Sequence, residues 1–280
     1  MLFDGFAFGM LLFVLSVGLS VTLGMMNFIN LAHCSFAMLG GYAAVSLMTG
    51  AGWPFFATLP AAFLAGAAAS VVLERTLYRR LYQASDLDQC LFTIGVVFMS
   101  IAAAAYFYGT DQQPVQLPAW LRGSVRAGAL HLGSYRLFLV VFGLAILAVL
   151  TIGLERTRFG AQVRAAVDRQ RTARGLGINV DAVFAVTFAL GGGLAGLGGA
   201  LAIELIGLDP GFALSNLVYV LIVVAVGGLG SIGGSFAAAA LLGISDVAGK
   251  YYIPALGSFF IYLVMVGVLM WRPAGLFGKR

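Results

Sequence analysis

Long apolar runs recur along the whole chain and constrain its fold more than any other feature. Nine runs can be placed, at residues 6–26, 34–50, 55–73, 90–108, 136–153, 182–203, 214–229, 234–248 and 256–271. A transmembrane helix needs about 20 predominantly apolar residues to cross the hydrocarbon core of a bilayer. The runs therefore predict an all-α fold, a polytopic transmembrane helical bundle with about eight or nine segments.

The composition excludes a soluble globular protein. Hydrophobic residues make up 61% of the 280 residues and charged residues only 10%, whereas a soluble domain carries about 25% charged residues. Few polar stretches interrupt the runs, so we expect one integral membrane domain over residues 1–280 with no appended soluble module. The first residues lack a basic region and a small-residue cleavage site, and no removable signal peptide is expected.

The basic residues predict the orientation of the chain. Twelve of the sixteen Lys and Arg residues fall in three clusters: Arg75, Arg79 and Arg80; Arg156, Arg158, Arg164, Arg169, Arg171 and Arg174; and Arg272, Lys279 and Arg280. Short cytoplasmic connections are enriched in Lys and Arg. We therefore expect the clusters and the C-terminus in the cytoplasm and, with nine segments, the N-terminus outside. The net charge of +5 then reports topology rather than a nucleic-acid partner.

A first polar break interrupts the apolar sequence between Leu23 and Ala44. Its polar side chains are Asn27, Asn30, His33 and Ser35. Inside a bilayer each of them needs a protein partner or a hydrated cavity to face. Two interpretations stay open: the side chains line a substrate pathway, or they form interhelical hydrogen bonds that pin a broken helix.

A second break, rich in glycine, follows the run at 214–229. Its candidate pathway residues are Gly228, Gly230, Ser231 and Gly233. The letters match GxGxxG, but a dinucleotide site requires a soluble strand-turn-helix unit, so the match is accidental. A tight turn between helices and a backbone lining of the pathway are both compatible with the pattern. The same Ser-Phe-Ala phrase opens the outgoing segment at 35–37 and 235–237, which suggests an internal repeat of two short or discontinuous helix pairs.

The longest charged stretch, residues 154–181, predicts a short cytoplasmic helix at about 160–177. Gln162 to Arg174 has helical composition without Gly or Pro, Gly175 and Gly177 are stop signals, and Asn179 offers an N-cap oxygen for the next helix. A basic helix of this kind either lies on anionic lipid or docks a cytoplasmic partner.

The sequence contains no candidate catalytic or metal site. No nucleophile–base or metal-ligand cluster is visible, and Cys34 and Cys90 have no metal-like spacing and imply no disulfide framework. A Walker A motif is missing as well, because Tyr251 follows Gly249-Lys250 and Ile244 replaces the first glycine. We expect a chain that is not an enzyme and holds no cofactor of its own.

Three passages resemble the permeases of branched-chain amino acid ABC importers. They are GMMNFINLAHCSFAMLGGY, RFGAQVRAAVDRQRTARGLGIN, and VGGLGSIGGSFAAAALLG followed by RPAGLFGKR, in the same order across nearly the whole chain. The resemblance implies a type II-like importer permease in a bacterial inner membrane. It also implies a second, similar permease, two cytoplasmic ATPases that bind ATP and Mg, and a periplasmic binding protein. Relatives serve urea, short amides and aromatic carboxylates too, so the cargo stays open.

The same resemblance assigns a coupling segment. RAAVDRQRTARGLGIN looks like the EAA-type segment, in which a short helix followed by glycine inserts into a groove of the ATPase. The residues assigned in this way are Arg164, Ala165, Ala166, Asp168, Arg169, Arg171, Arg174 and Gly177. The alternative is a gradient-driven secondary transporter or a passive channel, since such proteins also contain broken helices.

Overall fold

Each predicted run overlaps one apolar helix. The computed structural model describes residues 1–278 apart from 27, 83, 116, 128 and 129. Within this part of the chain the nine apolar helices are α1 (Leu2–Met26), α2 (His33–Gly50), α3 (Phe55–Thr76), α4 (Asp86–Tyr108), α5 (Ser134–Glu155), α8 (Val180–Ile206), α9 (Phe212–Gly227), α10 (Ile232–Tyr252) and α11 (Phe260–Trp271). The 3-10 helices η1 (Tyr78–Arg80) and η3 (Pro254–Phe259) follow α3 and precede α11. The all-α polytopic prediction is confirmed.

The helices flanking the two breaks differ in length. Helix α1 has 25 residues and α2 has 18, whereas α9 has 16 and α10 has 21. Six helices of the described chain, α1 and α10 among them, are long and apolar enough to cross a membrane. Both pairs are discontinuous, and each combines one longer and one shorter helix. Helix α10 extends past its apolar run, and there Lys250 Nζ donates to Asp246 Oδ2, four residues earlier, at 2.6 Å.

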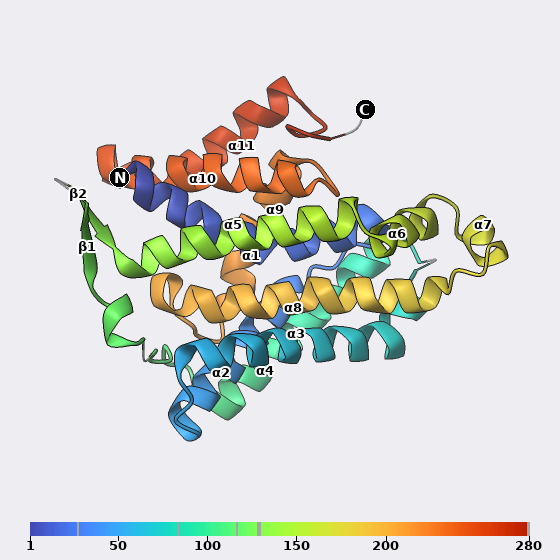
Figure 1. Ribbon diagram of the computed structural model, residues 1–280, viewed down its shortest axis with the longest axis horizontal. Coiled ribbons are helices and arrows are strands. Elements are labelled where there is room, and N and C mark those ends of the chain that lie inside the picture. The colour runs from blue at the N-terminus through green and yellow to red at the C-terminus, as the bar shows by residue number, and fades with distance from the viewer. Residues whose placement is uncertain (27, 83, 116, 128–129, 279–280) are drawn as a thin grey trace.

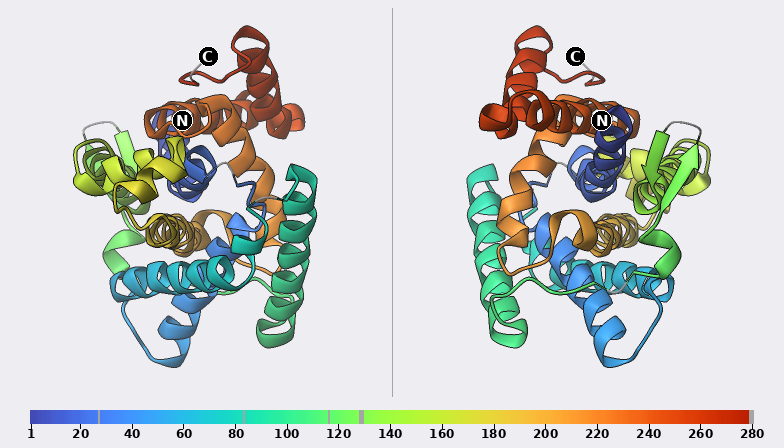
Figure 2. Two further views of the ribbon diagram at one scale, coloured as in Figure 1. Left: turned by 90° about the vertical axis from the view of Figure 1, so that its right-hand side faces the viewer. Right: turned by 90° about the vertical axis from the view of Figure 1, so that its left-hand side faces the viewer.

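Helix α8 lies in the middle of the bundle and packs on α1, α2 and α3 (Figure 1). Small residues allow this close approach, as the GxxxG spacing of Gly192 and Gly196 indicates. A Cβ atom on Gly192 would lie 2.3 Å from Ser70 Cβ, and one on Gly40 would lie 2.3 Å from Gly196 Cα. Helices α4 and α11 lie at the rim in both end-on views (Figure 2).

The bundle has two distinct ends. Helices α6 (Arg158–Asp168) and α7 (Gln170–Gly175) project at one end, and the N-terminus lies at the other (Figure 1). The sequence predicted a single helix here, but the chain breaks at Arg169, where φ is −149° and ψ is 87°. Composition gives no sign of this break because both halves have helical composition. Tertiary packing fixes it, since both helices contribute to one apolar cluster on the first turns of α8.

The connection between α4 and α5 contains regular structure. It holds the 3-10 helix η2 (Ala119–Leu121) and an antiparallel hairpin of β1 (Ser124–Ala127) and β2 (Leu130–Gly133), with Ser124 opposite Gly133. Strands of four residues give only a weak periodic signal in a sequence. The hairpin lies at the same end as the N-terminus (Figure 1).

The glycine packing around α8 predicts a large difference between two matched substitutions. A Cβ atom at Gly196 would meet Ala62 O at 2.4 Å, whereas one at Gly95 of α4 has no neighbour within 4 Å. Gly196→Val should therefore destabilise the bundle by about 1–3 kcal/mol, as overpacking does. Thermal unfolding in detergent should show a midpoint several degrees lower for Gly196→Val and little change for Gly95→Val. Equal midpoints would mean that α8 does not depend on this contact.

Candidate functional site

The first break, between α1 and α2, has its backbone held by side chains of α4. The Ile29 N–H donates to Gln89 Oε1 at 3.0 Å, and the Leu31 N–H donates to Thr93 Oγ1 at 3.2 Å. Gln89 is itself fixed, because its Nε2 donates to Leu81 O at 3.2 Å. Backbone groups that leave a helix inside a membrane need such partners.

The polar side chains of this break tie it to neighbouring helices. Asn30 is buried, and its Oδ1 accepts from the Tyr78 hydroxyl at 3.3 Å. His33 is buried as well, and its Nε2 donates to Leu15 O at 2.9 Å. Asn27 lies outside the described residues. The observed contacts pin the break against α1 and the end of α3.

Ser35 faces a cavity of about 600 Å³ between α2, α3 and α4. Ser100 Oγ donates to Ser35 Oγ at 2.8 Å on its wall. The rings of Tyr42 and Tyr108, which also line the cavity, stack with centroids 4.2 Å apart. The cavity thus combines an apolar lining with a few hydroxyl groups.

The second break is a tight turn between α9 and α10. Gly228 has φ +93° and Gly230 has φ +78°, a backbone region that favours glycine. Ser231 caps α10 by accepting from the Gly234 N–H at 3.0 Å, and Gly233 is exposed. The packing interpretation of this turn accounts for its conformation, and a pathway role for these residues stays a prediction.

The two breaks are neighbours in space. A Cβ atom on Gly24, near the end of α1, would lie 1.8 Å from Gly230 Cα. One turn earlier in α1, Ser20 Oγ lies 2.5 Å from Ser235 Oγ of α10, with both side chains buried. The two breaks, which the sequence suggested to be related, therefore lie together in one region of the fold.

The segment after α11 closes over the second break. The Leu276 N–H donates to Val226 O at 2.7 Å, and the Phe277 N–H donates to Gly227 O at 3.2 Å. These bonds satisfy carbonyl groups at the end of α9 that have no helical partner. Sequence reasoning missed this contact, because nothing in the tail indicates which helix end it reaches.

The predicted coupling residues divide between an outer and an inner face. Arg164, Arg169, Arg171, Arg174 and Gly177 are exposed, Ala165 is half-buried, Ala166 is fully buried, and Asp168 is the last residue of α6. Ala166 lies in the apolar cluster with the first turns of α8, so it packs toward the bundle. Sequence reasoning missed Leu176, whose side chain is 76% exposed next to Gly177.

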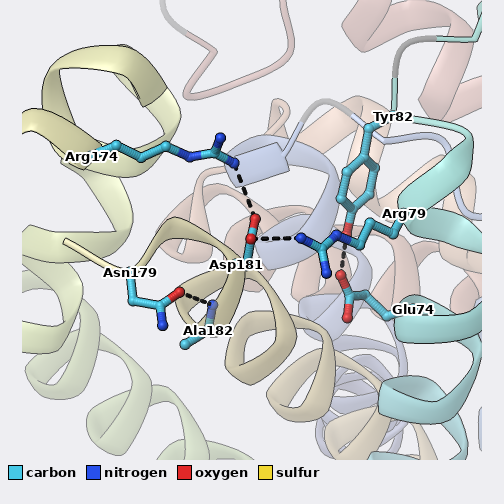
Figure 3. A network of polar contacts seen from close by, with 7 residues as sticks. All are labelled: Glu74, Arg79, Tyr82, Arg174, Asn179, Asp181 and Ala182. Atoms are coloured by element: carbon cyan, nitrogen blue, oxygen red, sulfur yellow. Dashed lines mark hydrogen bonds and ion pairs between the residues drawn. The ribbon is translucent and has the colours of Figure 1, made fainter.

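An ion-pair network joins this segment to the bundle (Figure 3). The Asp181 carboxylate accepts from Arg79 Nη2 at 2.6 Å and from Arg174 Nη2 at 3.1 Å. Close by, the Tyr82 hydroxyl donates to Glu74 Oε1 at 2.7 Å. Burial, together with that carboxylate, raises the pKa of Tyr82, so its phenol stays protonated. Asn179 caps α8 as predicted, since its Oδ1 accepts from the Ala182 N–H at 3.0 Å.

Aromatic packing connects the network to the first break. The ring of Phe28 lies 5.7 Å from that of Tyr82 and 5.0 Å from that of Tyr78, between ring centroids. Tyr82 also packs edge-on against Phe184 of α8, at 5.8 Å. No pattern in the sequence marks these aromatic residues, since they stand among other apolar residues.

The described residues hold no group of three His, Cys, Asp or Glu side chains suited to a metal ion. Both cysteines are free. The polar and glycine-rich residues of this region instead hold breaks between membrane helices, next to a basic segment at one end of the bundle.

These features define a multi-pass, all-α membrane protein with broken helices. The family model described as branched-chain amino acid transport system / permease component matches residues 1–269, and the chain belongs to this family. It is 27% identical to the high-affinity branched-chain amino acid transport system permease protein BraD of Pseudomonas aeruginosa, over 99% of this chain and 95% of that protein. It is 28% identical to the corresponding permease protein LivH of Escherichia coli, over 99% of this chain and 94% of LivH. Its identity to the permease protein LivM of Salmonella typhimurium is 25%, over 95% of this chain and 68% of LivM.

The hydrogen bond from Ile29 predicts the effect of removing its acceptor. Gln89→Leu leaves the Ile29 N–H without its partner, which should cost about 1–3 kcal/mol. Hydrogen exchange of the full chain in detergent should show faster exchange at residues 28–32 in this variant. The control is Gln162→Leu at an exposed position of α6, which should leave these amides unchanged. Unaltered protection in Gln89→Leu would refute the anchoring role of α4.

Proposed function

We propose that this chain is a transmembrane permease subunit of an ABC importer for branched-chain amino acids or a related small carboxylate or amide solute. Separate cytoplasmic ATPases, which bind ATP and Mg, would drive it by closing on α6 and α7. One observation carries the proposal: a chain of the branched-chain permease family presents an exposed basic segment at one end of its bundle, directly beside its broken helices.

The position of the basic residues supports a cytoplasmic location for the α6–α7 end. Arg79 and Arg174 come from two different basic clusters of the sequence, and one carboxylate brings them together. Arg272 of the third cluster begins the tail that packs on the second break, where Leu276 and Phe277 donate to the end of α9. We infer that the chain spans a bacterial inner membrane with this end on the cytoplasmic side, the N-terminus outside and the C-terminus in the cytoplasm.

The partners follow from the same family membership. The chain is similar to both LivH and LivM, two permease proteins of branched-chain amino acid transport systems. This double similarity supports pairing with a second permease of similar fold. Two ATPases would dock at α6–α7, and a periplasmic binding protein would deliver the solute at the opposite end.

The proposed pathway runs along the two breaks. Asn30, His33 and Ser35 from the first break and the Gly228–Gly233 turn lie in neighbouring parts of the fold. Their amide, imidazole and hydroxyl groups already bond within the chain, so they suit a gate better than a high-affinity binding site. We infer that solute selection rests mainly with the binding protein.

The proposed ATPase contact is the outer face of α6–α7. Arg169 and Arg171 are exposed there, and the apolar side chain of Leu176 extends the same surface. Exposed apolar residues beside charged ones are typical of protein interfaces. Ala166 supports this face from the inside rather than touching the ATPase.

Uptake by the reconstituted complex tests the proposal. With the second permease, the ATPases and loaded binding protein in proteoliposomes, labelled leucine should enter only when ATP is hydrolysed. Arg169→Glu/Arg171→Glu should lower the affinity for the ATPases about tenfold, since interface charges steer and stabilise docking. Arg122→Glu, exposed in the connection between α4 and α5, is the control and should bind normally.

Two results would contradict the proposal. Leucine uptake by this chain alone, driven by an ion gradient without ATP, would select a secondary transporter or passive channel. Normal ATPase binding by the Arg169→Glu/Arg171→Glu variant would show that α6–α7 is not the docking surface.

A further inference from the structure

One carboxylate joins three elements that are far apart in the sequence. Arg79 belongs to η1 after α3, Arg174 to the last turn of α7, and Asp181 to the first turn of α8. Each carboxylate oxygen of Asp181 pairs with a different arginine (Figure 3). Oδ2 lies 2.6 Å from Arg79 Nη2, and Oδ1 lies 3.1 Å from Arg174 Nη2. The arrangement fixes the position of α7 relative to both α3 and α8.

We propose that Asp181 is a positioning residue for coupling. It holds α7 against the ends of α3 and α8, so that a displacement of α6–α7 by the ATPases reaches the first break. This inference rests on the proposed function and adds to it the contact that carries the displacement.

The ion-pair network positions α7 and adds little to the stability of the fold. The side chains of Arg79, Arg174 and Asp181 are 57%, 59% and 47% exposed, and exposed ion pairs contribute little to stability. Asp181 is also not needed to cap α8, because Asn179 provides the cap. The apolar cluster beneath α6 and α7 supplies their packing without it. The role of Asp181 is therefore to set the angle and distance between η1, α7 and α8.

A continuous set of contacts leads from Arg79 to the break. Tyr82 follows Arg79 by three residues, is tied to Glu74 of α3 by its hydroxyl, and packs against Phe28. Phe28 lies in the break itself, two residues before Asn30. A shift of η1 imposed through Arg79 thus reaches the break through Tyr82.

The test uses the complete transporter in proteoliposomes and measures leucine uptake and ATP hydrolysis in the same vesicles. Asp181→Asn should transport about fivefold less leucine per ATP hydrolysed, in the range seen for substitutions within coupling networks. Its thermal midpoint and its affinity for the ATPases should stay as in the unsubstituted transporter. Asp181→Glu, which keeps the charge, should recover most of the ratio.

Two further variants sharpen the test. Asp86→Asn is the matched control, because it also removes an acidic residue from the first turn of a helix, here α4. It reproduces the loss of a favourable charge at a helix N-terminus, and this variant should transport normally. Arg79→Ala should lower the ratio as well, and the double variant should be no worse than Asp181→Asn alone, because both substitutions break the Arg79–Asp181 ion pair.

The outcomes separate this inference from the proposed function. If the unsubstituted transporter shows no ATP-driven uptake, the proposed function fails. If that uptake is present, an unchanged ratio in Asp181→Asn, additive effects in the double variant, or a lowered thermal midpoint would each overturn the positioning role alone.

Discussion

The two hydrogen bonds from the first break to α4 are the interaction on which the rest of this structure depends. In a bilayer an unpaired backbone group costs several kcal/mol, so a chain that leaves the helical path needs a partner for every exposed N–H. Gln89 and Thr93 supply those partners for Ile29 and Leu31. Because of them, α1 can end and α2 can begin inside the bundle without a water-exposed loop.

Close packing of the helices then determines where the two breaks lie in the bundle. Gly24 and Gly230 bring the two breaks together, and the glycines of α8 let α1, α2 and α3 approach the central helix. Ridges of small residues make such contacts specific, since no Cβ atom fits between the backbones. The segment after α11 completes the arrangement by bonding to the end of α9. The breaks are therefore fixed from several sides, and the side chains of Asn30, His33 and Ser35 are already paired.

The sequence predicted local features better than long-range ones. The helix positions, the cap at Asn179, the turn at Gly228 and the close approach at Gly196 all follow from periodicity, capping and residue size. The split of the predicted cytoplasmic helix at Arg169 depends on packing against α8, and both halves have helical composition.

No local sequence pattern indicated which residues far apart in the chain form hydrogen bonds with each other. Gln89 lies 60 residues from Ile29, and Asp181 lies 102 residues from Arg79. The structure places Asp181 between Arg79 and Arg174, which belong to two different basic clusters. Likewise, the sequence does not indicate that Ala166 of the predicted coupling segment packs inward. Pairings of this kind depend on how helices are ordered in space, which no local window of residues specifies.

The central claim is that movement of α6–α7 reaches the first break and α2. Spin labels at exposed Gln162 of α6 and at Leu39, on the α2 wall of the cavity, would measure it directly in the complete transporter. Electron paramagnetic resonance should then give different label distances in the nucleotide-free and ATP-bound states, and Asp181→Asn should reduce that difference. An identical distance in both states, with the ATPases bound and turning over, would contradict the account.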